Sequence, residues 1–257
     1  MPSPENPRHK ATVARVDKLL GHAPPVLALH GFTLGGAMFK ELDQLMDVPF
    51  VTWDLPGHGG RDATDTSWEA AVGEVLEKVR AWEPSTVLGY SMGGRLALAA
   101  ALQEPDLFQR LVLVSTSVGI EDSDERAERR RRDEETADAI EATGNAEDFL
   151  RQFGETPFLQ APGSSIELEA IRLSNSADGI VGALRGMGQG AQPYLGAELA
   201  TLDIPIVWIA GVRDEKYKAI AKQAAAACRR GRAVLALAAH NVIAEDPAAV
   251  AAVVMAG

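Results

Sequence analysis

The sequence is poor in cysteine and lacks long apolar runs. Cys228 is the only cysteine among 257 residues, which excludes an intramolecular disulfide framework. No apolar stretch is long enough to span a bilayer. The first ten residues hold three prolines and no apolar core, so we expect no signal peptide there. These absences predict a cytoplasmic protein with no membrane partner.

Positive charge is also scarce. Lysine and arginine together number 25 against 36 acidic residues, a net charge of −11. The average field of such a chain repels nucleic acid and anionic lipid, so we expect neither as a partner. No metal-ligand spacing and no dinucleotide fingerprint occurs, so we expect no metal and no cofactor. Cations that gather in a pocket of so acidic a chain would point to an anionic ligand.

The sequence does contain short apolar runs that alternate with helical patterns. This alternation predicts an α/β fold with a mainly parallel sheet covered by helices on both faces. We expect strands at residues 26–29, 50–53, 86–88, 111–114, 206–209 and 233–237, with a possible edge strand at 13–16. We expect helices between them at residues 68–82, 93–103, 216–228 and 247–255.

The segment 121–200 departs from this alternation, because no strand pattern occurs from 121 to about 190. It opens with a charge-dense helical stretch at 121–135, where Asp122 and Glu125 form a plausible capping pair. Further helical stretches follow at 165–174 and 177–187. We therefore expect a single core, residues 1–120 and 201–257, with an all-helical lid at 121–200.

The run Gly89-Tyr90-Ser91-Met92-Gly93 fits the pattern G-x-S-x-G between a predicted strand and a predicted helix. That context is the nucleophile elbow of the α/β-hydrolase fold, in which a strained turn exposes the serine hydroxyl. The alternative is a glycine-rich turn with an incidental serine. In an elbow, the Met92 N–H would form half of an oxyanion hole, and the Phe32 N–H would supply the second donor.

A serine hydroxyl needs a base, and the base needs a carboxylate that orients it. In this fold the chain order is serine, acid, histidine. Asp214 follows the strand at 206–209, and His240 follows the strand at 233–237, so both lie at the edge of the sheet where Ser91 lies. Glu215 and Asp203 compete as the acid, although Asp203 precedes its strand. The remaining histidines follow no late strand, and we expect structural roles for two of them, His30 and His58.

Arginines provide the candidate anion site. Arg95 lies in the first turn after Ser91, where a cation opposes the helix dipole, so it suits either an anionic ligand or a structural ion pair. The run from Arg129 to Arg132 lies among acidic residues, and most of it is expected to be a solvated helix face. Arg172 lies in a lid helix. If Arg172 and one other lid arginine point inward, they form a carboxylate clamp.

The chain resembles the 2-succinyl-6-hydroxy-2,4-cyclohexadiene-1-carboxylate synthases of menaquinone biosynthesis, which have the α/β-hydrolase fold. General parts of the resemblance are His30-Gly31-Phe32, the loop Asp54-Leu55-Pro56-Gly57-His58-Gly59 and the elbow. The specific parts are the elbow with its extension Gly94-Arg95, Arg126-Ala127-Glu128-Arg129, Ile171-Arg172-Leu173-Ser174-Asn175, Gly188-Gln189-Gly190-Ala191-Gln192-Pro193 and Asp214-Glu215-Lys216-Tyr217.

The resemblance implies catalytic roles for Ser91, Asp214 and His240. It also implies that Arg95, Arg129 and Arg172 bind substrate carboxylates and that Tyr90 and Phe153 line the site, Phe153 where the family often has tryptophan. The sequence departs from the family at Ala239, where glycine is usual, and at Ile243 and Ala244, where polar residues are common.

The implied reaction is elimination of pyruvate from a multi-carboxylate ring compound by a carbon–oxygen lyase that needs no cofactor. We expect a monomer or a small homo-oligomer. A carboxylesterase or carbon–carbon bond hydrolase, with Ser91 as acyl nucleophile, is the alternative that shares the triad. A non-catalytic ligand receptor on the same fold is a third, against which an intact triad argues.

Overall fold

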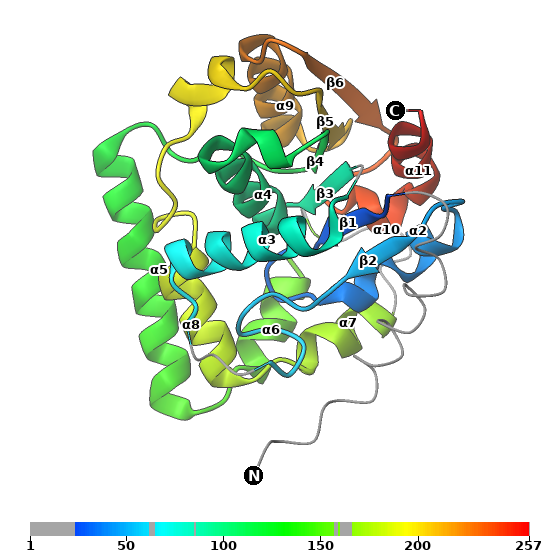
Figure 1. Cartoon of the computed structure of the whole chain (residues 1–257). Helices are drawn as coiled ribbons and strands as arrows, with labels where there is room; N and C mark the ends of the chain where they lie inside the picture. Colours follow the sequence, from blue (N-terminus) through cyan, green and yellow to red (C-terminus); the bar gives the residue numbers. More distant parts are fainter. Residues whose placement is uncertain (1–23, 62–64, 85, 157–158, 160–165, 257) are drawn as a thin grey trace.

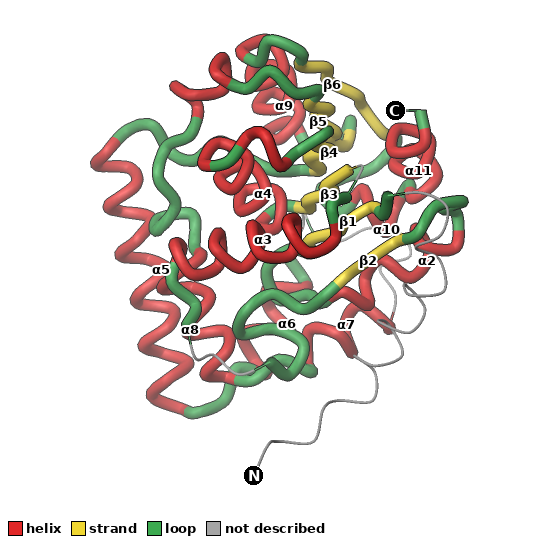
Figure 2. Tube along the Cα trace, viewed as in Figure 1, coloured by secondary structure: helices red, strands yellow, loops and turns green. Residues whose placement is uncertain are grey.

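Six parallel strands form one sheet with helices on both faces, as Figures 1 and 2 show. The structure is a computed structural model that describes residues 24–61, 65–84, 86–156, 159 and 166–256. The expected edge strand at 13–16 lies outside these residues. The α/β fold predicted from the alternating pattern is confirmed.

The sheet has the order β2-β1-β3-β4-β5-β6, and all of its neighbouring pairs are parallel. Its strands are β1 (Val26–Leu29), β2 (Phe50–Thr52), β3 (Thr86–Tyr90), β4 (Leu111–Val114), β5 (Ile206–Gly211) and β6 (Gly231–Ala236). The first and the third to fifth of these strands are buried along their whole length. Parallel pairing brings all six carboxyl ends to one edge of the sheet, where ligands bind in folds of this class.

Alternate strand residues enter two separate hydrophobic clusters, one on each face of the sheet. In β1, Leu27 and Leu29 pack on one side, and Val26 and Ala28 pack on the other. The first cluster includes residues of α3 (Trp68–Trp82), α4 (Met92–Gln103) and α9 (Glu215–Ala227). The second includes residues of α2 (Lys40–Gln44), α10 (Val242–Glu245) and α11 (Pro247–Met255). The two-sided covering explains why these strands are continuously apolar.

Between β4 and β5 the described chain contains helices and no strand, and this segment is called the insert below. These helices are α5 (Ser123–Thr143), α6 (Glu147–Gly154), α7 (Ile166–Leu173), α8 (Ala177–Met187) and the 3-10 helix η3 (Gly196–Thr201). Asp122 caps α5 by accepting hydrogen bonds from the backbone N–H groups of Asp124 and Glu125. The helix continues past residue 135 to Thr143, where Gly144 ends it with φ of 63°.

Short elements were not predicted from the sequence. Helix α6 has eight residues, too few for its apolar spacing to stand out, and Phe149 and Leu150 show their role only when they pack on other helices. The 3-10 helices η1 (Gly36–Phe39) and η2 (Pro105–Leu107) were also missed.

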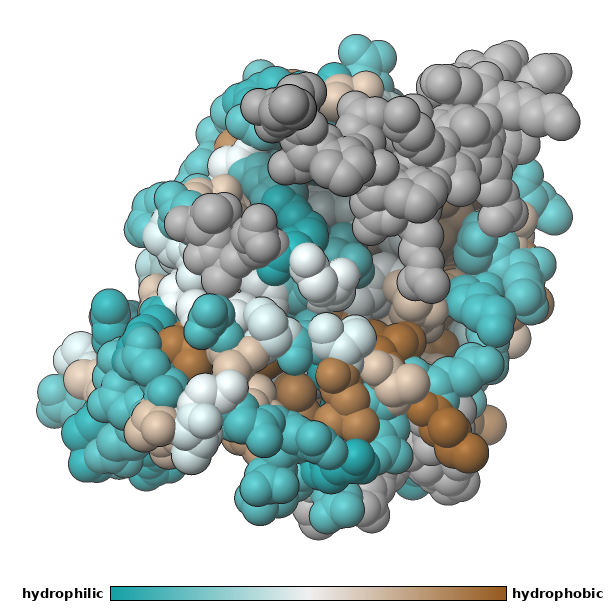
Figure 3. Space-filling model, turned by 90° about the horizontal axis from the view of Figure 1, so that it is seen from below, coloured by the Kyte–Doolittle hydropathy of each residue, from teal (hydrophilic) through white to brown (hydrophobic). Residues whose placement is uncertain are grey.

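The insert is joined to the core by direct hydrogen bonds. The Asn175 side chain, which follows α7, accepts from the Gly59 N–H at 2.9 Å and donates to the Thr33 carbonyl at 2.9 Å. No described helix is long and apolar enough to cross a membrane. On the face shown in Figure 3, apolar surface forms patches among polar ones.

Candidate active site

Ser91 occupies a strained turn between β3 and α4. Its φ of 50° and ψ of −108° lie in a region that residues with a side chain rarely adopt. A Cβ on Gly89 would lie 2.4 Å from the Gly94 Cα, and one on Gly93 would lie 2.4 Å from the Leu29 carbonyl oxygen. The turn therefore needs glycine on both sides of the serine, as the nucleophile-elbow prediction requires.

Asp214 and His240 form a buried pair at the same edge of the sheet. His240 Nδ1 lies 2.7 Å from Asp214 Oδ2, and Asp214 Oδ1 accepts from the Tyr217 N–H at 3.1 Å. Burial acts to raise the pKa of Asp214, but the hydrogen bonds from His240 and the Tyr217 N–H outweigh it, and the pKa falls below its ordinary value. Glu215 is exposed and pairs with Lys218 instead, and Asp203 is exposed. The geometry thus favours Asp214 as the orienting acid.

Two backbone amides near Ser91 are the predicted oxyanion donors. Within the described chain, neither the Phe32 N–H nor the Met92 N–H has a hydrogen-bond acceptor. A Cβ on Gly31 would lie 3.4 Å from the Ser91 Cβ, so the loop that carries Phe32 runs directly against the elbow. Both donors thus belong to segments that meet at Ser91, and the oxyanion hole stays a prediction.

His30 and His58 have the structural roles expected of them. His30 is buried, its Nδ1 contacts the Gly31 carbonyl at 2.8 Å, and its Nε2 accepts from the Leu55 N–H at 2.8 Å. Burial lowers the pKa of His30 to about 4 and that of His58 to about 3. Both imidazoles are therefore neutral near pH 7, and they brace the loop that carries Phe32.

The Arg172 guanidinium is buried and makes no hydrogen bond with the described residues. Its Nε has no partner and no solvent contact. Burial lowers the pKa of Arg172, while the nearby Tyr90 acts to raise it. A buried cation without a partner costs free energy, so this side chain is suited to an anion that is bound rather than permanent.

Arg95 is buried but already has acceptors. It donates to the Met187 carbonyl at 2.8 Å and to Gln192 Oε1 at 3.3 Å, and it lies 5.9 Å from the centre of the Trp68 ring. Burial lowers the pKa of Arg95 to about 10. No acidic side chain in the described chain forms an ion pair with it. Arg95 therefore anchors the segment after α8 with neutral acceptors, not with the ion pair considered from the sequence.

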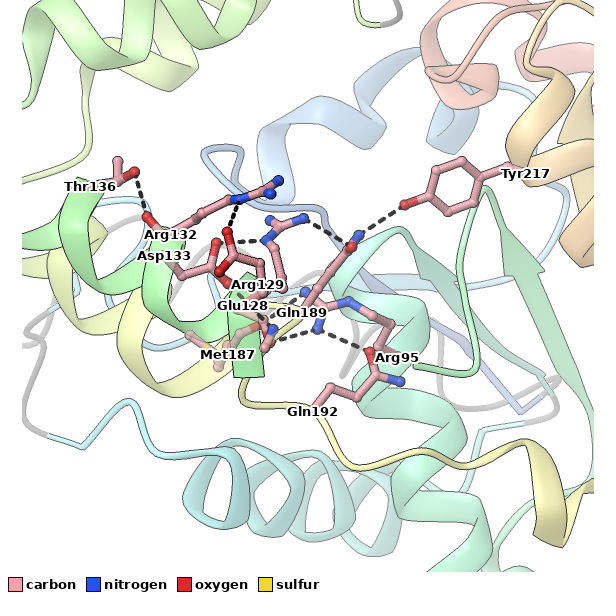
Figure 4. Close-up of polar contacts among 12 residues, drawn as sticks. Arg95, Glu128, Arg129, Arg132, Asp133, Thr136, Met187, Gln189, Gln192 and Tyr217 are labelled. Atoms are coloured by element: carbon pink, nitrogen blue, oxygen red, sulfur yellow. Dashed lines mark hydrogen bonds and ion pairs between the residues drawn. The ribbon is translucent and has the colours of Figure 1, made fainter. Parts of the chain in front are cut away.

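Arg129 lies half-exposed on α5. Its Nε donates to Asp133 Oδ1 at 2.8 Å, and its Nη1 donates to Gln189 Oε1 at 3.0 Å, as Figure 4 shows. Together with Gln189 and Lys216 it lines an open groove whose lining does not include Ser91. The next three arginines are exposed, two of them paired with Glu128, as expected for a solvated helix face.

Comparison with known proteins identifies the family. The model of the alpha/beta hydrolase family matches residues 26–253. A putative 2-succinyl-6-hydroxy-2,4-cyclohexadiene-1-carboxylate synthase of Bacillus subtilis (strain 168) is 32% identical over 236 residues, which cover 86% of this chain and 85% of the relative. The chain belongs to this synthase family of alpha/beta hydrolases.

Further relatives and solved structures support the same family and fold. A 2-succinyl-6-hydroxy-2,4-cyclohexadiene-1-carboxylate synthase of Salmonella agona is 30% identical over 89% of this chain and 91% of its own. The structure of MenH from S. aureus matches with a TM-score of 0.84 and 27% identity, over 90% of this chain and 92% of that one. A hydrolase from Pseudomonas aeruginosa, at 21% identity and a TM-score of 0.77, shares the fold.

Aromatic rings of this synthase-family chain lie beside His240 and beside the loop that carries Phe32, called the oxyanion loop after its predicted role. The Tyr90 ring is buried 5.7 Å from the His240 ring, and burial raises the pKa of Tyr90 far above its ordinary value. Phe153 is half-buried and meets Phe32 edge-on at 5.3 Å. Phe153 therefore fills an aromatic position beside the oxyanion loop, although it lacks the N–H of the tryptophan common in the synthase family.

The departures from the family pattern are accommodated by packing. The Ala239 N–H donates to Glu245 Oε2 at 2.9 Å, a backbone contact that alanine makes as glycine would. Ile243 is buried in the second hydrophobic cluster, which explains an apolar residue there.

The structure adds residues to which sequence reasoning gave no role. Tyr217 packs against His240, and Gln189 joins it to Arg129. Thr116 donates to the Ser91 carbonyl at 2.7 Å. Tyr217 and Gln189 do lie inside motifs of the synthase family, and this was the signal that could have found them.

Proposed function

We propose that this protein is a carbon–oxygen lyase of menaquinone biosynthesis. It eliminates pyruvate from 2-succinyl-5-enolpyruvyl-6-hydroxy-3-cyclohexene-1-carboxylate and leaves 2-succinyl-6-hydroxy-2,4-cyclohexadiene-1-carboxylate. The observation that carries the proposal, in a chain of this family, is the buried and unpartnered Arg172 on the insert. An enzyme for neutral esters has no use for such a cation, whereas a substrate with several carboxylates does.

In this proposal the triad acts on carbon. His240, oriented by Asp214, takes the proton of Ser91, and the Ser91 oxygen removes a proton from the substrate ring. The electron pair moves toward the succinyl carbonyl and then through the ring to break the carbon–oxygen bond of the enolpyruvyl ether. The departing enolate takes up a proton and becomes pyruvate. The electron sink lies in the substrate itself, so these steps call for no cofactor.

The remaining site residues bind and orient the substrate. The Phe32 and Met92 N–H groups hold the enolate-like oxygen, where fixed donors stabilise charge as it develops. The substrate carboxylates are bound by Arg172 and Arg129. Arg95 contributes to this binding by holding the segment after α8 in place.

Tyr90 and Phe153 form apolar walls of the site in this proposal. Residues 121–200 act as its lid, because Arg129, Phe153 and Arg172 all come from that insert.

The test supplies the enolpyruvyl substrate and measures pyruvate with a coupled assay. Rapid pyruvate release, together with poor cleavage of simple aryl acetates, is the expected result. Efficient aryl acetate cleavage without pyruvate release would instead favour the carboxylesterase or carbon–carbon bond hydrolase that shares the same triad.

A further inference from the structure

Tyr217 contacts both polar partners proposed to act on Ser91. Its backbone N–H donates to Asp214 Oδ1 at 3.1 Å. Its ring meets the His240 ring edge-on, with centroids 4.5 Å apart and an interplanar angle of 61°. One buried residue therefore contacts the carboxylate through its backbone and the imidazole through its ring.

The hydroxyl of Tyr217 is held in turn by Gln189. Gln189 Nε2 donates to the Tyr217 hydroxyl at 3.1 Å, and Gln189 Oε1 accepts from Arg129 Nη1 at 3.0 Å. Figure 4 shows the amide lying between the two side chains. Glutamine suits this position because its amide has a donor end and an acceptor end. Burial raises the pKa of Tyr217, so its hydroxyl keeps its proton near neutral pH.

The segment that carries Gln189 is fixed from two helices. Arg95 of α4 donates to the Met187 carbonyl at 2.8 Å. From α5, Asp133 accepts the Gly190 N–H at 3.3 Å with one oxygen and Arg129 Nε at 2.8 Å with the other. A Cβ on Gly190 would lie 2.3 Å from the Arg130 backbone nitrogen, so the segment runs directly against α5. Gln189 therefore has little freedom to leave Tyr217.

Arg129 has donors for both Gln189 and a bound anion. Its Nε and Nη1 bind Asp133 and Gln189, whereas its Nη2 makes no hydrogen bond within the described residues. The Nη2 donors of Arg129 therefore remain for a carboxylate, at a groove whose lining also includes Lys216 and four acidic residues, Glu121, Asp122, Glu125 and Glu128.

We infer that Tyr217 and Gln189 are positioning residues that tie the orientation of His240 to Arg129 on the insert. The inference rests on the proposed function in that it takes His240 as the base and Arg129 as a substrate-binding arginine. Loss of either link in the chain frees the Tyr217 ring, and His240 then spends less time in line with Ser91. The effect is on the chemical step and not only on substrate binding, so kcat falls.

The test measures a reaction that does not need the natural substrate. A neutral p-nitrophenyl phosphonate diester labels an activated serine, and the release of p-nitrophenol gives the rate. In the full-length protein, Tyr217→Phe and Gln189→Leu should each slow labelling of Ser91 about 2- to 10-fold, the effect of one hydrogen bond. Because both break the same chain, the double variant should be no slower than the slower single variant.

Two matched variants separate positioning from general disturbance. Gln189→Glu keeps an acceptor for Arg129 and lets the Tyr217 hydroxyl donate, so labelling should return to near the wild-type rate. Tyr194→Phe removes the hydroxyl of a tyrosine outside the site and should not change the rate. Thermal unfolding of each variant checks that it is folded.

Wild-type labelling rates in Tyr217→Phe and Gln189→Leu would overturn the inference, as would fully additive losses or failure of the wild type to be labelled at Ser91. Pyruvate release by the wild type tests the proposed function separately. If labelling follows the expected pattern while no pyruvate forms, the positioning role stands and the assigned substrate is wrong.

Discussion

Glu245 Oε2 accepts a hydrogen bond at 2.9 Å from the backbone N–H of Ala239, the residue immediately before His240. The same oxygen pairs with Arg213, which also donates to the Leu237 carbonyl at 3.3 Å. The other Glu245 oxygen is buried and has no partner in the described chain. The Glu245 carboxylate thus fixes the loop that carries His240, the proposed base, at the edge of the sheet.

We expect Glu245→Ala to lower the free energy of unfolding by about 0.5–1.5 kcal/mol, since it removes the acceptor of the partly buried Ala239 N–H. Glu245→Gln keeps an acceptor for the Ala239 N–H, so its free energy of unfolding should fall less. Urea denaturation followed by circular dichroism measures both. Glu215→Ala is the matched control, because Glu215 is exposed and, among the residues the structure describes, pairs with Lys218 alone. A loss as large in the control as in Glu245→Ala would contradict the assignment.

Ser91→Ala should abolish pyruvate release and leave substrate binding largely intact. The hydroxyl acts in the chemical step, whereas the arginines and aromatic rings that bind the substrate are unchanged. Binding by calorimetry and turnover by the coupled assay measure the two effects separately. Persistent turnover in this variant would remove Ser91 from the mechanism.

Arg172→Met should separate activity from stability. The cation is buried and has no partner in the part of the chain that the structure describes, so an apolar side chain of similar length should leave the free energy of unfolding unchanged or raise it. The same change removes a charge-assisted contact to a carboxylate, and KM should rise about 10- to 100-fold. Thermal denaturation and steady-state kinetics test this pair of outcomes. A clear loss of stability would mean that Arg172 has a structural partner.

Arg95→Ala should behave differently from Arg172→Met. Arg95 donates to the Met187 carbonyl and to Gln192, so its removal leaves buried acceptors and should destabilise the protein by about 1–3 kcal/mol. Substrate handling should weaken as well, because the segment that carries Gln189 loses its anchor on α4. Steady-state kinetics and denaturation of the same preparation measure the change in KM and the change in the free energy of unfolding. An effect on KM alone would mean that Arg95 is purely a ligand for the substrate.

Stability should fall as the pH drops from about 6.5 toward 4, because His30 and His58 are buried in neutral form. Their folded pKa values, about 4 and about 3, lie below the ordinary value of 6.5, so the unfolded chain binds more protons in this range. Each histidine should remove roughly 2 kcal/mol by pH 5. Urea denaturation at a series of pH values measures the slope.

A His58→Gln variant is the control for this pH dependence. It should take up about one proton fewer on unfolding between pH 4 and 6 than the wild type does. An unchanged slope would show that His58 does not remain neutral in the folded state.

The sequence by itself determined the core of the fold and the chain order of the proposed triad. Strands at Val26–Leu29 and Leu111–Val114 and helices at Trp68–Trp82, Ala177–Met187 and Pro247–Met255 have the expected bounds. The reason is local, because apolar periodicity and a glycine-flanked serine are properties of neighbouring residues. A histidine and an aspartate that follow late parallel strands must lie at the same edge, so Asp214 and His240 could also be named.

Only the tertiary structure decided which polar groups meet. Arg95 and Arg172 are both arginines in helices, yet Arg95 is anchored by a backbone carbonyl, whereas the Arg172 guanidinium has no partner among the described residues. The contact of Tyr217 with His240 and the bridge through Gln189 join α5, the segment after α8, and α9. Such contacts depend on how separate elements pack against one another, and no local pattern in the sequence encodes that packing.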